Sequence, residues 1–149
     1  MNSPLFKSLI NICWVLLAGL SLLSCSDSTP KEGIEVRDGW IRKMPSGVTN
    51  TAAFFTILNH TGEPVTLTGV SIEGADHVMM HETKVVDDMA KMVHLDKVII
   101  DNEVRFEPGG KHVMVMGLSV TEATKSYNMK LHFANKPTLD VKAEVRNSK

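Results

Sequence analysis

Apolar and polar residues alternate with a period of two, in short runs, over most of the chain beyond residue 33. Alternation of this kind is typical of β-strands with one buried face, and no long segment carries the period of a helix. Turn-forming residues separate the runs, as at Asp87-Asp88 and at residues 107–110. We therefore predict eight or so strands, at residues 34–43, 51–59, 65–72, 78–86, 90–100, 111–116, 127–133 and 138–145.

The N-terminal segment has the composition of an export signal. Lys7 precedes an almost uncharged apolar run, residues 9–23, which is shorter than a membrane-spanning helix needs. The run ends in Leu-Leu-Ser-Cys25, which resembles a bacterial lipobox, so we expect Cys25 to become the first mature residue and to carry a lipid. An ordinary cleaved signal and an uncleaved anchor are the alternatives. As a lipoprotein, the chain would be exported to the periplasm and anchored to a bacterial membrane.

The predicted organisation is therefore a leader and one domain. Residues 1–25 form the leader, and the polar residues 26–33, with Pro and Gly, form a flexible tether. Residues 34–149 form a single all-β domain, for which short strands at this spacing favour a Greek-key sandwich or barrel.

Cysteine usage and charge exclude several classes of function. Cys13 leaves with the leader and Cys25 would be acylated, so the domain keeps no thiol for a disulfide, a metal or catalysis. The formal net charge is −1, and loss of Lys7 with the leader takes it to −2. Neither nucleic-acid binding nor a polybasic lipid-binding patch is expected from this charge.

Methionine and histidine cluster in one part of the chain. Of nine methionines, six lie between positions 79 and 116, together with three histidines. These residues are Met79, Met80, Met89, Met92, Met114, Met116, His81, His94 and His112. Thioether sulfur binds Cu(I) well and hard cations poorly, and imidazole binds copper in either oxidation state. A mixed Met and His site without Cys therefore selects copper, with Cu(I) favoured as the number of thioethers rises.

Strand parity places these donors on the faces that the valines leave free. In residues 111–116, Val113 and Val115 point to one face, and His112, Met114 and Met116 point to the other. By the same rule, Met92 and His94 point to the face opposite Val93 and Leu95. Met79 and His81 also share one face of their strand. The donors are expected to face outward or toward a sheet rim. A single Met is more often a core residue, and His60, His77 and His132 are expected to be structural.

At this point the chain resembles the PCuAC-type periplasmic copper chaperones. The motif that carries the resemblance is His81, ten intervening residues, Met92, and then His112-x-Met114. Further matching segments are Gly39-Trp40-Ile41-Arg42, Met44-Pro45-Ser46-Gly47, His81-Glu82 and the run from Pro108 to Leu118. The spacing between Met92 and His112 is slightly shorter than is usual in the family, and His94 replaces a residue that is often basic or polar.

The resemblance implies a cupredoxin-like β-sandwich that binds Cu(I) through His81, Met92, His112 and Met114. It also implies delivery of copper to respiratory oxidase assembly, to the copper-A subunit of cytochrome oxidase, alongside a Sco-type thiol protein. His94 is interpreted as a bystander, with a fifth, exchangeable ligand as the alternative. Trp40 is interpreted as a core residue. Glu82 is a candidate hydrogen-bond partner of a ligand imidazole, with a solvated carboxylate as the equal alternative.

The predicted function is thus a monomeric copper-delivery protein and not an enzyme. A copper buffer or resistance protein with the same ligands remains the alternative. A blue-copper electron carrier is excluded because such a site needs a Cys ligand. A hydrolase is a weaker hypothesis, since no Gly-x-Ser-x-Gly elbow and no free thiol are present. A metal-free scaffold is also a weaker hypothesis.

Overall fold

The alternating runs fold into ten β-strands in a computed structural model, which describes residues 32–121 and 123–147. The strands are β1 (Ile34–Arg42), β2 (Thr51–Asn59), β3 (Val65–Ile72), β4 (His77–Val86), β5 (Met89–His94), β6 (Val98–Ile100), β7 (Glu103–Phe106), β8 (Lys111–Met116), β9 (Ser126–Phe133) and β10 (Leu139–Arg146). The run predicted at 90–100 is two strands, β5 and β6, because the chain leaves the extended conformation at residues 95–97. Strand β7 was missed, since it is only four residues long and two of these are charged.

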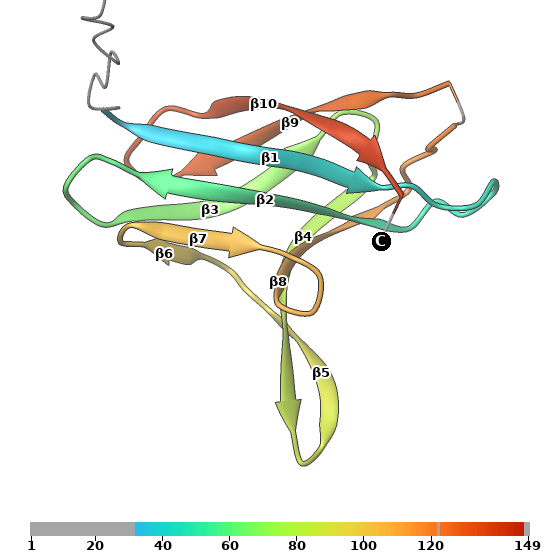
Figure 1. Ribbon diagram of the computed structural model, residues 1–149, viewed down its shortest axis with the longest axis horizontal. Coiled ribbons are helices and arrows are strands. Elements are labelled where there is room, and N and C mark those ends of the chain that lie inside the picture. Colours follow the sequence, from blue (N-terminus) through green and yellow to red (C-terminus); the bar gives the residue numbers. More distant parts are fainter. Residues whose placement is uncertain (1–31, 122, 148–149) are drawn as a thin grey trace, which may run out of the picture. The chain divides into compact units, whose positions relative to one another are not determined.

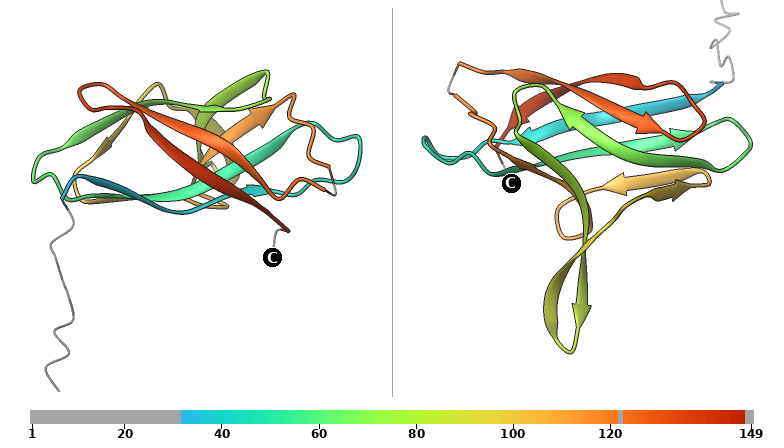
Figure 2. Two further views of the ribbon diagram at one scale, coloured as in Figure 1. Left: turned by 90° about the horizontal axis from the view of Figure 1, so that it is seen from above. Right: turned by 180° about the vertical axis from the view of Figure 1, so that it is seen from behind.

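The strands form one mixed sheet that folds over on itself (Figures 1 and 2). Their order is β5-β4-β8-β7-β2-β1-β10-β9-β3-β6, with an additional pairing of β8 to β2. The pairs β1–β10 and β7–β8 are parallel, and the other pairs are antiparallel. The prediction of a single all-β domain is confirmed.

One hydrophobic core fills the space between the two halves of the folded sheet. Every strand except β5 contributes to it, with alternate residues pointing inward. The rings of Phe55 on β2 and Phe106 on β7 stack there with centroids 4.5 Å apart. On β4 and β8 the inward side chains are Met80, Val113 and Val115, all buried. Their burial fixes which face of these two strands points away from the core.

The β4–β5 hairpin extends beyond the sandwich (Figure 1). Its turn is the pair Asp87-Asp88, as predicted, and both residues have positive φ, 53° and 59°. Two successive left-handed residues make a type I′ turn, which matches the twist of a two-stranded ribbon. No residue of β5 is buried, and Val85 near the tip is 74% exposed. Strand β5 is therefore held mainly by its ladder to β4.

Several predictions concern residues outside the described part of the chain. The leader (1–25), its lipobox Cys25 and most of the tether (26–33) lie there. Within residues 32–121 and 123–147, no helix is long and apolar enough to span a membrane.

The two isoleucines of β6 test the assignment of the core. Ile100 is fully buried and its neighbour Ile99 is 58% exposed on the opposite face. We expect Ile100→Ala to lower the free energy of unfolding by about 2–5 kcal/mol, because it removes packed side-chain atoms and leaves a cavity. Ile99→Ala should change it by less than about 0.5 kcal/mol. Urea unfolding of both variants measures this, and equal losses would contradict the assignment.

Candidate metal site

Three histidines lie in a row across three neighbouring strands. Strand β4 pairs with β5 on one side and β8 on the other, and His81 on β4 is in register with both His94 and His112. Residues in register on adjacent strands share a face, so the three rings lie side by side. The ring centroids of His81 and His94 are 5.4 Å apart, and those of His81 and His112 are 6.0 Å apart. We call these three residues the histidine row.

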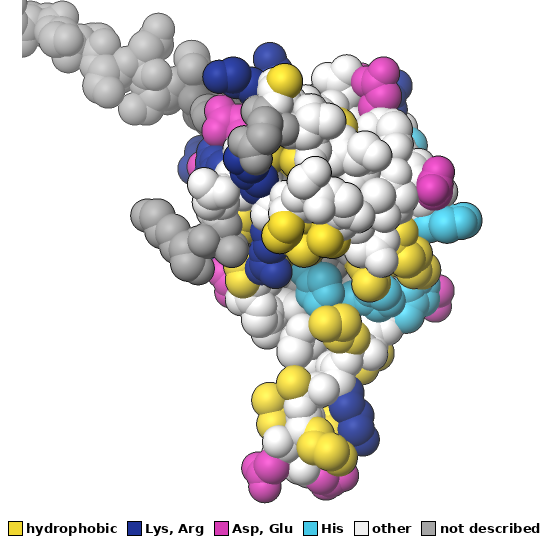
Figure 3. Space-filling model, turned by 90° about the vertical axis from the view of Figure 1, so that its right-hand side faces the viewer, with side chains coloured by type: hydrophobic (Ala, Val, Ile, Leu, Met, Phe, Trp, Pro, Cys, Tyr) yellow, Lys and Arg dark blue, Asp and Glu magenta, His cyan; other side chains and the backbone are white. Residues whose placement is uncertain are grey.

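The two predicted sulfur ligands lie on the same face as the histidine row. Met114 follows His112 by two residues on β8, and Met92 precedes His94 by two residues on β5. Figure 3 shows the histidine side chains gathered where the hairpin leaves the body, with apolar side chains beside them. The structure thus brings the four residues His81, Met92, His112 and Met114 together on one surface of three adjacent strands.

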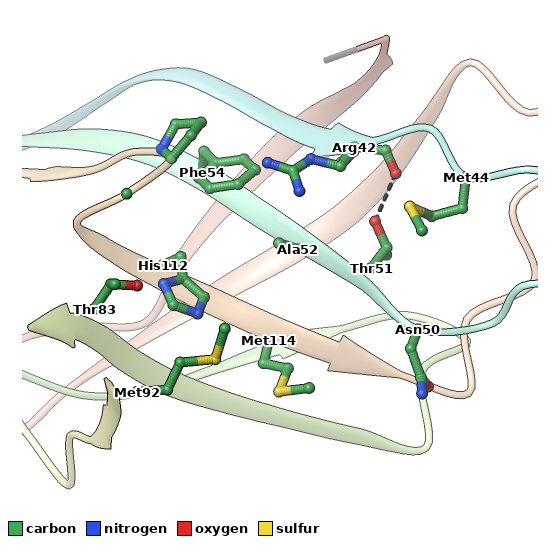
Figure 4. Close-up of a pocket in the computed structure, with 12 residues that line it drawn as sticks. Arg42, Met44, Asn50, Thr51, Ala52, Phe54, Thr83, Met92, His112 and Met114 are labelled. Atoms are coloured by element: carbon green, nitrogen blue, oxygen red, sulfur yellow. Dashed lines mark hydrogen bonds between the residues drawn. The ribbon is translucent and has the colours of Figure 1, made fainter. Parts of the chain in front are cut away.

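A cavity of about 280 Å³ opens beside these donors. Figure 4 shows Met92 and Met114 next to the His112 ring in its wall. The remaining wall comes from β1, β2, Thr83 on β4 and two loops; its residues are Arg42, Met44, Asn50, Thr51, Ala52, Phe54, Thr83, Pro108 and Gly109. His81 does not line this cavity but adjoins it through its contact with His112.

The donors differ greatly in exposure. Met92 is 67% exposed, whereas His112 is only 8% exposed. Strand parity correctly set His112 away from the core, but the expectation of an outward or rim position is wrong for this residue. Pro108 and Gly109 of the preceding turn line the cavity beside it. The site therefore has a covered side at β8 and an open side at the hairpin.

The nitrogen atoms of the row are arranged with lone pairs available. His112 Nδ1 lies 3.1 Å from the Gly110 carbonyl oxygen, which can only accept, so Nδ1 donates and Nε2 keeps its lone pair. His81 Nδ1 is buried and has no hydrogen-bond partner. A buried polar atom without a partner is costly, and a bound ligand would satisfy it.

The electrostatics of the face favour neutral imidazole. Burial lowers the pKa of His81 below its ordinary value of 6.5, and the neighbouring His94 and His112 lower it further. Glu82 does not contact an imidazole: its carboxylate accepts a hydrogen bond from Lys111 at 2.6 Å and pairs with Lys84 at 3.3 Å. The Lys111 contact holds the pKa of Glu82 below its ordinary range. The proposed role of Glu82 as partner of a ligand imidazole is therefore wrong.

The other methionines of the cluster occupy different positions. Met79 and Met116 are partly buried on the donor face, where Met79 is in register with Met114. Met80 points into the core and is 4% exposed. Met89 lies beside the hairpin turn, 57% exposed, in register with Val86. Met80 is thus a packing residue, and Met89 is far along the hairpin from the row.

The histidines predicted to be structural include two with clear partners. His132 contacts the hydroxyls of Ser71 and Thr138 at 2.9 and 3.3 Å, and His60 lies 3.5 Å from Glu35. His77 is exposed at the start of β4. Within the described ranges, no three His, Asp or Glu side chains converge on one point as they stand. A metal ion bound here by histidines would therefore also need the methionine sulfurs as ligands, or one imidazole ring would have to move.

The aromatic and cationic part of the cavity was not predicted from the sequence. Trp40 was expected in the core, but it stacks on Phe54 with ring centroids 4.4 Å apart, on the face opposite Ile41. The guanidinium of Arg42 lies 5.3 Å from the centre of the Phe54 ring (Figure 4). Alternation along β1 and β2 could have revealed this, since Trp40, Arg42 and Phe54 alternate with the core residues Ile41 and Phe55.

The pKa of His81 provides a test in the metal-free protein. Because folding favours the neutral ring, its contribution to stability is complete above about pH 6.5 and declines as the pH falls below that value. We expect an NMR titration midpoint for His81 below 6.5. His94→Gln should raise the midpoint without restoring 6.5, since burial remains, whereas His132→Gln should not move it. A midpoint at or above 6.5 would contradict the described environment.

The comparisons with known proteins agree with this fold. Residues 34–145 match the model of a family described as "Putative lipoprotein LpqE-like". A search of curated protein sequences gives no significant match. The copper-bound PCuAC domain from PmoF2 superposes with a TM-score of 0.63 at 21% identity, over 77% of this chain and 93% of that domain.

A second solved protein, DR1885 from Deinococcus radiodurans, is also similar. Its apo form gives a TM-score of 0.61 at 25% identity, over 79% of this chain and 81% of that one. Its Cu(I) form gives 0.59 at 24% identity, over 83% of both chains. The family predicted from the sequence is thus confirmed: the chain belongs to the LpqE-like family, and its domain has the PCuAC fold.

Proposed function

We propose that this protein binds Cu(I) through His81, Met92, His112 and Met114 and passes the metal to another protein. The observation that carries the proposal is the common face of these four donors, on three adjacent strands beside one cavity. Two similar solved structures, of PmoF2 and DR1885, contain copper or Cu(I), which supports the same cargo here.

The donor chemistry selects the ion. Two neutral thioethers and two neutral imidazoles suit Cu(I), while Mg, Ca and Mn need oxygen ligands and Zn favours thiolate, imidazole or carboxylate. No carboxylate contacts the predicted ligands among the described residues, since Glu82 is held by two lysines. The lone pairs on His112 Nε2 and His81 Nδ1 are the nitrogen donors that the geometry offers.

The uneven exposure of the ligands supports a delivery role. His112 is covered, whereas Met92 stands on β5, an exposed edge strand that pairs only with β4. An acceptor thiol can displace Met92 first, while the covered ligands still hold the ion. Ligand exchange then proceeds in steps through a shared intermediate. A closed site would have no such entry point.

The acceptor and the location belong to the same proposal. We infer that lipidated Cys25 anchors the protein to a bacterial membrane on the periplasmic side. The acceptor would be the copper-A subunit of cytochrome oxidase, with a Sco-type thiol protein acting in the same assembly. A monomer suffices, because one chain supplies all four ligands. The second candidate is a copper buffer, which would use the same ligands without a dedicated acceptor.

Substitution of the methionines tests the ligand assignment. We expect Met92→Leu and Met114→Leu each to weaken Cu(I) binding about tenfold or more, equivalent to about 1.4 kcal/mol, because Leu keeps the volume but removes the sulfur donor. Competition with a chromogenic Cu(I) chelator measures the affinity. His112→Gln should weaken it as well, with circular dichroism as a check of folding for this buried residue.

Met89→Leu is the matched control, since Met89 is an exposed methionine on the same hairpin but lies beside its turn. Its Cu(I) affinity should equal that of the unchanged protein. The assignment fails if the unchanged protein takes up no Cu(I), or if the variants at positions 92 and 114 bind as it does.

Transfer to an acceptor separates delivery from buffering. We expect Cu(I)-loaded protein to metallate the soluble copper-A domain of an oxidase faster than Cu(I) supplied by a small-molecule chelator does. Two Cu(I) ions form a colourless centre, so aliquots are oxidised by one electron with ferricyanide, and the absorbance of the mixed-valence centre measures the copper transferred. The Met89→Leu protein should transfer at the same rate. Transfer no faster than release into a chelator would favour the buffer.

A further inference from the structure

We propose that the histidine row forms a second donor set at the same site, in which His94 joins His81 and His112 to bind Cu(II). The proposal rests on the proposed function, because it shares two ligands with the Cu(I) site. It assigns a role to a residue that the sequence alone suggested was a bystander.

The geometry of the row is the first support. His81 is the middle member and is in register with both neighbours, so its ring has an imidazole on each side. The His94 ring meets it edge-on, at an interplanar angle of 72° and 5.4 Å between centroids. His112 approaches from the other strand at 49° and 6.0 Å. Strands in a sheet lie about 4.8 Å apart, so side chains leaning inward from both sides can meet above the middle strand.

The ring nitrogens provide the second support. His81 Nδ1 is buried without a partner, and His112 Nε2 is free because Nδ1 donates to Gly110. On His94, Nε2 lies 3.3 Å from the Asp96 carboxylate, which leaves Nδ1 for a metal. His112 thus has the arrangement of many metal-binding histidines, in which one nitrogen is oriented by an oxygen and the other ligates.

The position of His94 gives it the freedom to complete the set. The three rings do not yet converge on one point, so a ring must move when the ion binds. His94 has a half-exposed side chain, its partner Asp96 is 94% exposed, and its strand is paired only with β4. An exposed contact between an imidazole and a carboxylate contributes little to stability. Reorienting His94 toward His81 therefore costs little.

The chemistry separates the two donor sets by oxidation state. Cu(II) prefers nitrogen and oxygen ligands in a tetragonal arrangement, whereas thioethers favour Cu(I). His81 and His112 serve both ions. Met92 and Met114 complete the set for Cu(I), and His94 with solvent water completes the set for Cu(II). Since Met92 and His94 are two residues apart on one face of β5, one hairpin supplies the ligand that distinguishes the two ions.

Cu(II) titration with electron paramagnetic resonance tests the inference. We expect one Cu(II) per chain with a nitrogen hyperfine pattern of three imidazoles. His94→Gln should reduce the pattern to two nitrogens and weaken Cu(II) binding about tenfold or more, while Cu(I) affinity stays unchanged. Met92→Leu should have the reverse effect, weakening Cu(I) binding and leaving the Cu(II) spectrum as it was.

His60→Gln is the control, because His60 is also an exposed histidine with a carboxylate neighbour but lies far along the chain from the row. It should alter neither ion. The inference is overturned if the unchanged protein gives no nitrogen-coordinated Cu(II) signal. It is overturned equally if His94→Gln leaves the nitrogen pattern intact or if His60→Gln has the same effect as His94→Gln. Failure of the proposed function would appear separately, as absence of Cu(I) binding by the unchanged protein.

Discussion

The pairing register of β4 with β8 is the constraint on which the site depends. Met80 and Val113 face each other in the core, and this contact sets His81 opposite His112 on the other side of the same two strands. A slip of one residue would turn the imidazoles into the core and the apolar side chains outward. The hydrophobic effect therefore positions the polar donors, although none of them packs in the core. The face that carries the donors is the reverse side of a well-packed interior.

The sequence allowed the face of each donor to be predicted, but not all of its neighbours on adjacent strands. Period-two alternation correctly separated Val113 and Val115 from His112 and Met114, because one buried face dictates the pattern. The two-residue turn at Asp87-Asp88 fixes the register of β4 and β5, so the pairing of His94 with His81 could have been deduced and was missed. The pairing of β4 with β8 depends on contacts distant in the chain, so the meeting of His81 with His112 could not be deduced. The same limit explains His112, whose cover comes partly from the turn at residues 108–110 rather than from its own strand.

Two other discrepancies have local causes. Trp40 was expected in the core, because large aromatic side chains usually lie there. It instead stacks on Phe54 on the other face of the sheet, where Phe54 is buried. The only sign of this position in the sequence is that Trp40 is adjacent to the core residue Ile41, so that the two side chains point to opposite faces of β1. Glu82 adjoins His81 in the chain, and adjacent residues of a strand point to opposite faces. Its carboxylate consequently contacts Lys111 and Lys84 and not the imidazoles.

The exposed position of Met92 also makes its sulfur open to oxidation. Peroxides convert an accessible thioether to a sulfoxide, which is polar and no longer offers the soft sulfur donor. Met80, enclosed in the core, is protected from this reaction, whereas two-thirds of the Met92 side chain is open to solvent. Oxidation would therefore reach the hairpin first and leave the fold intact. A methionine sulfoxide reductase would then be needed to restore the thioether.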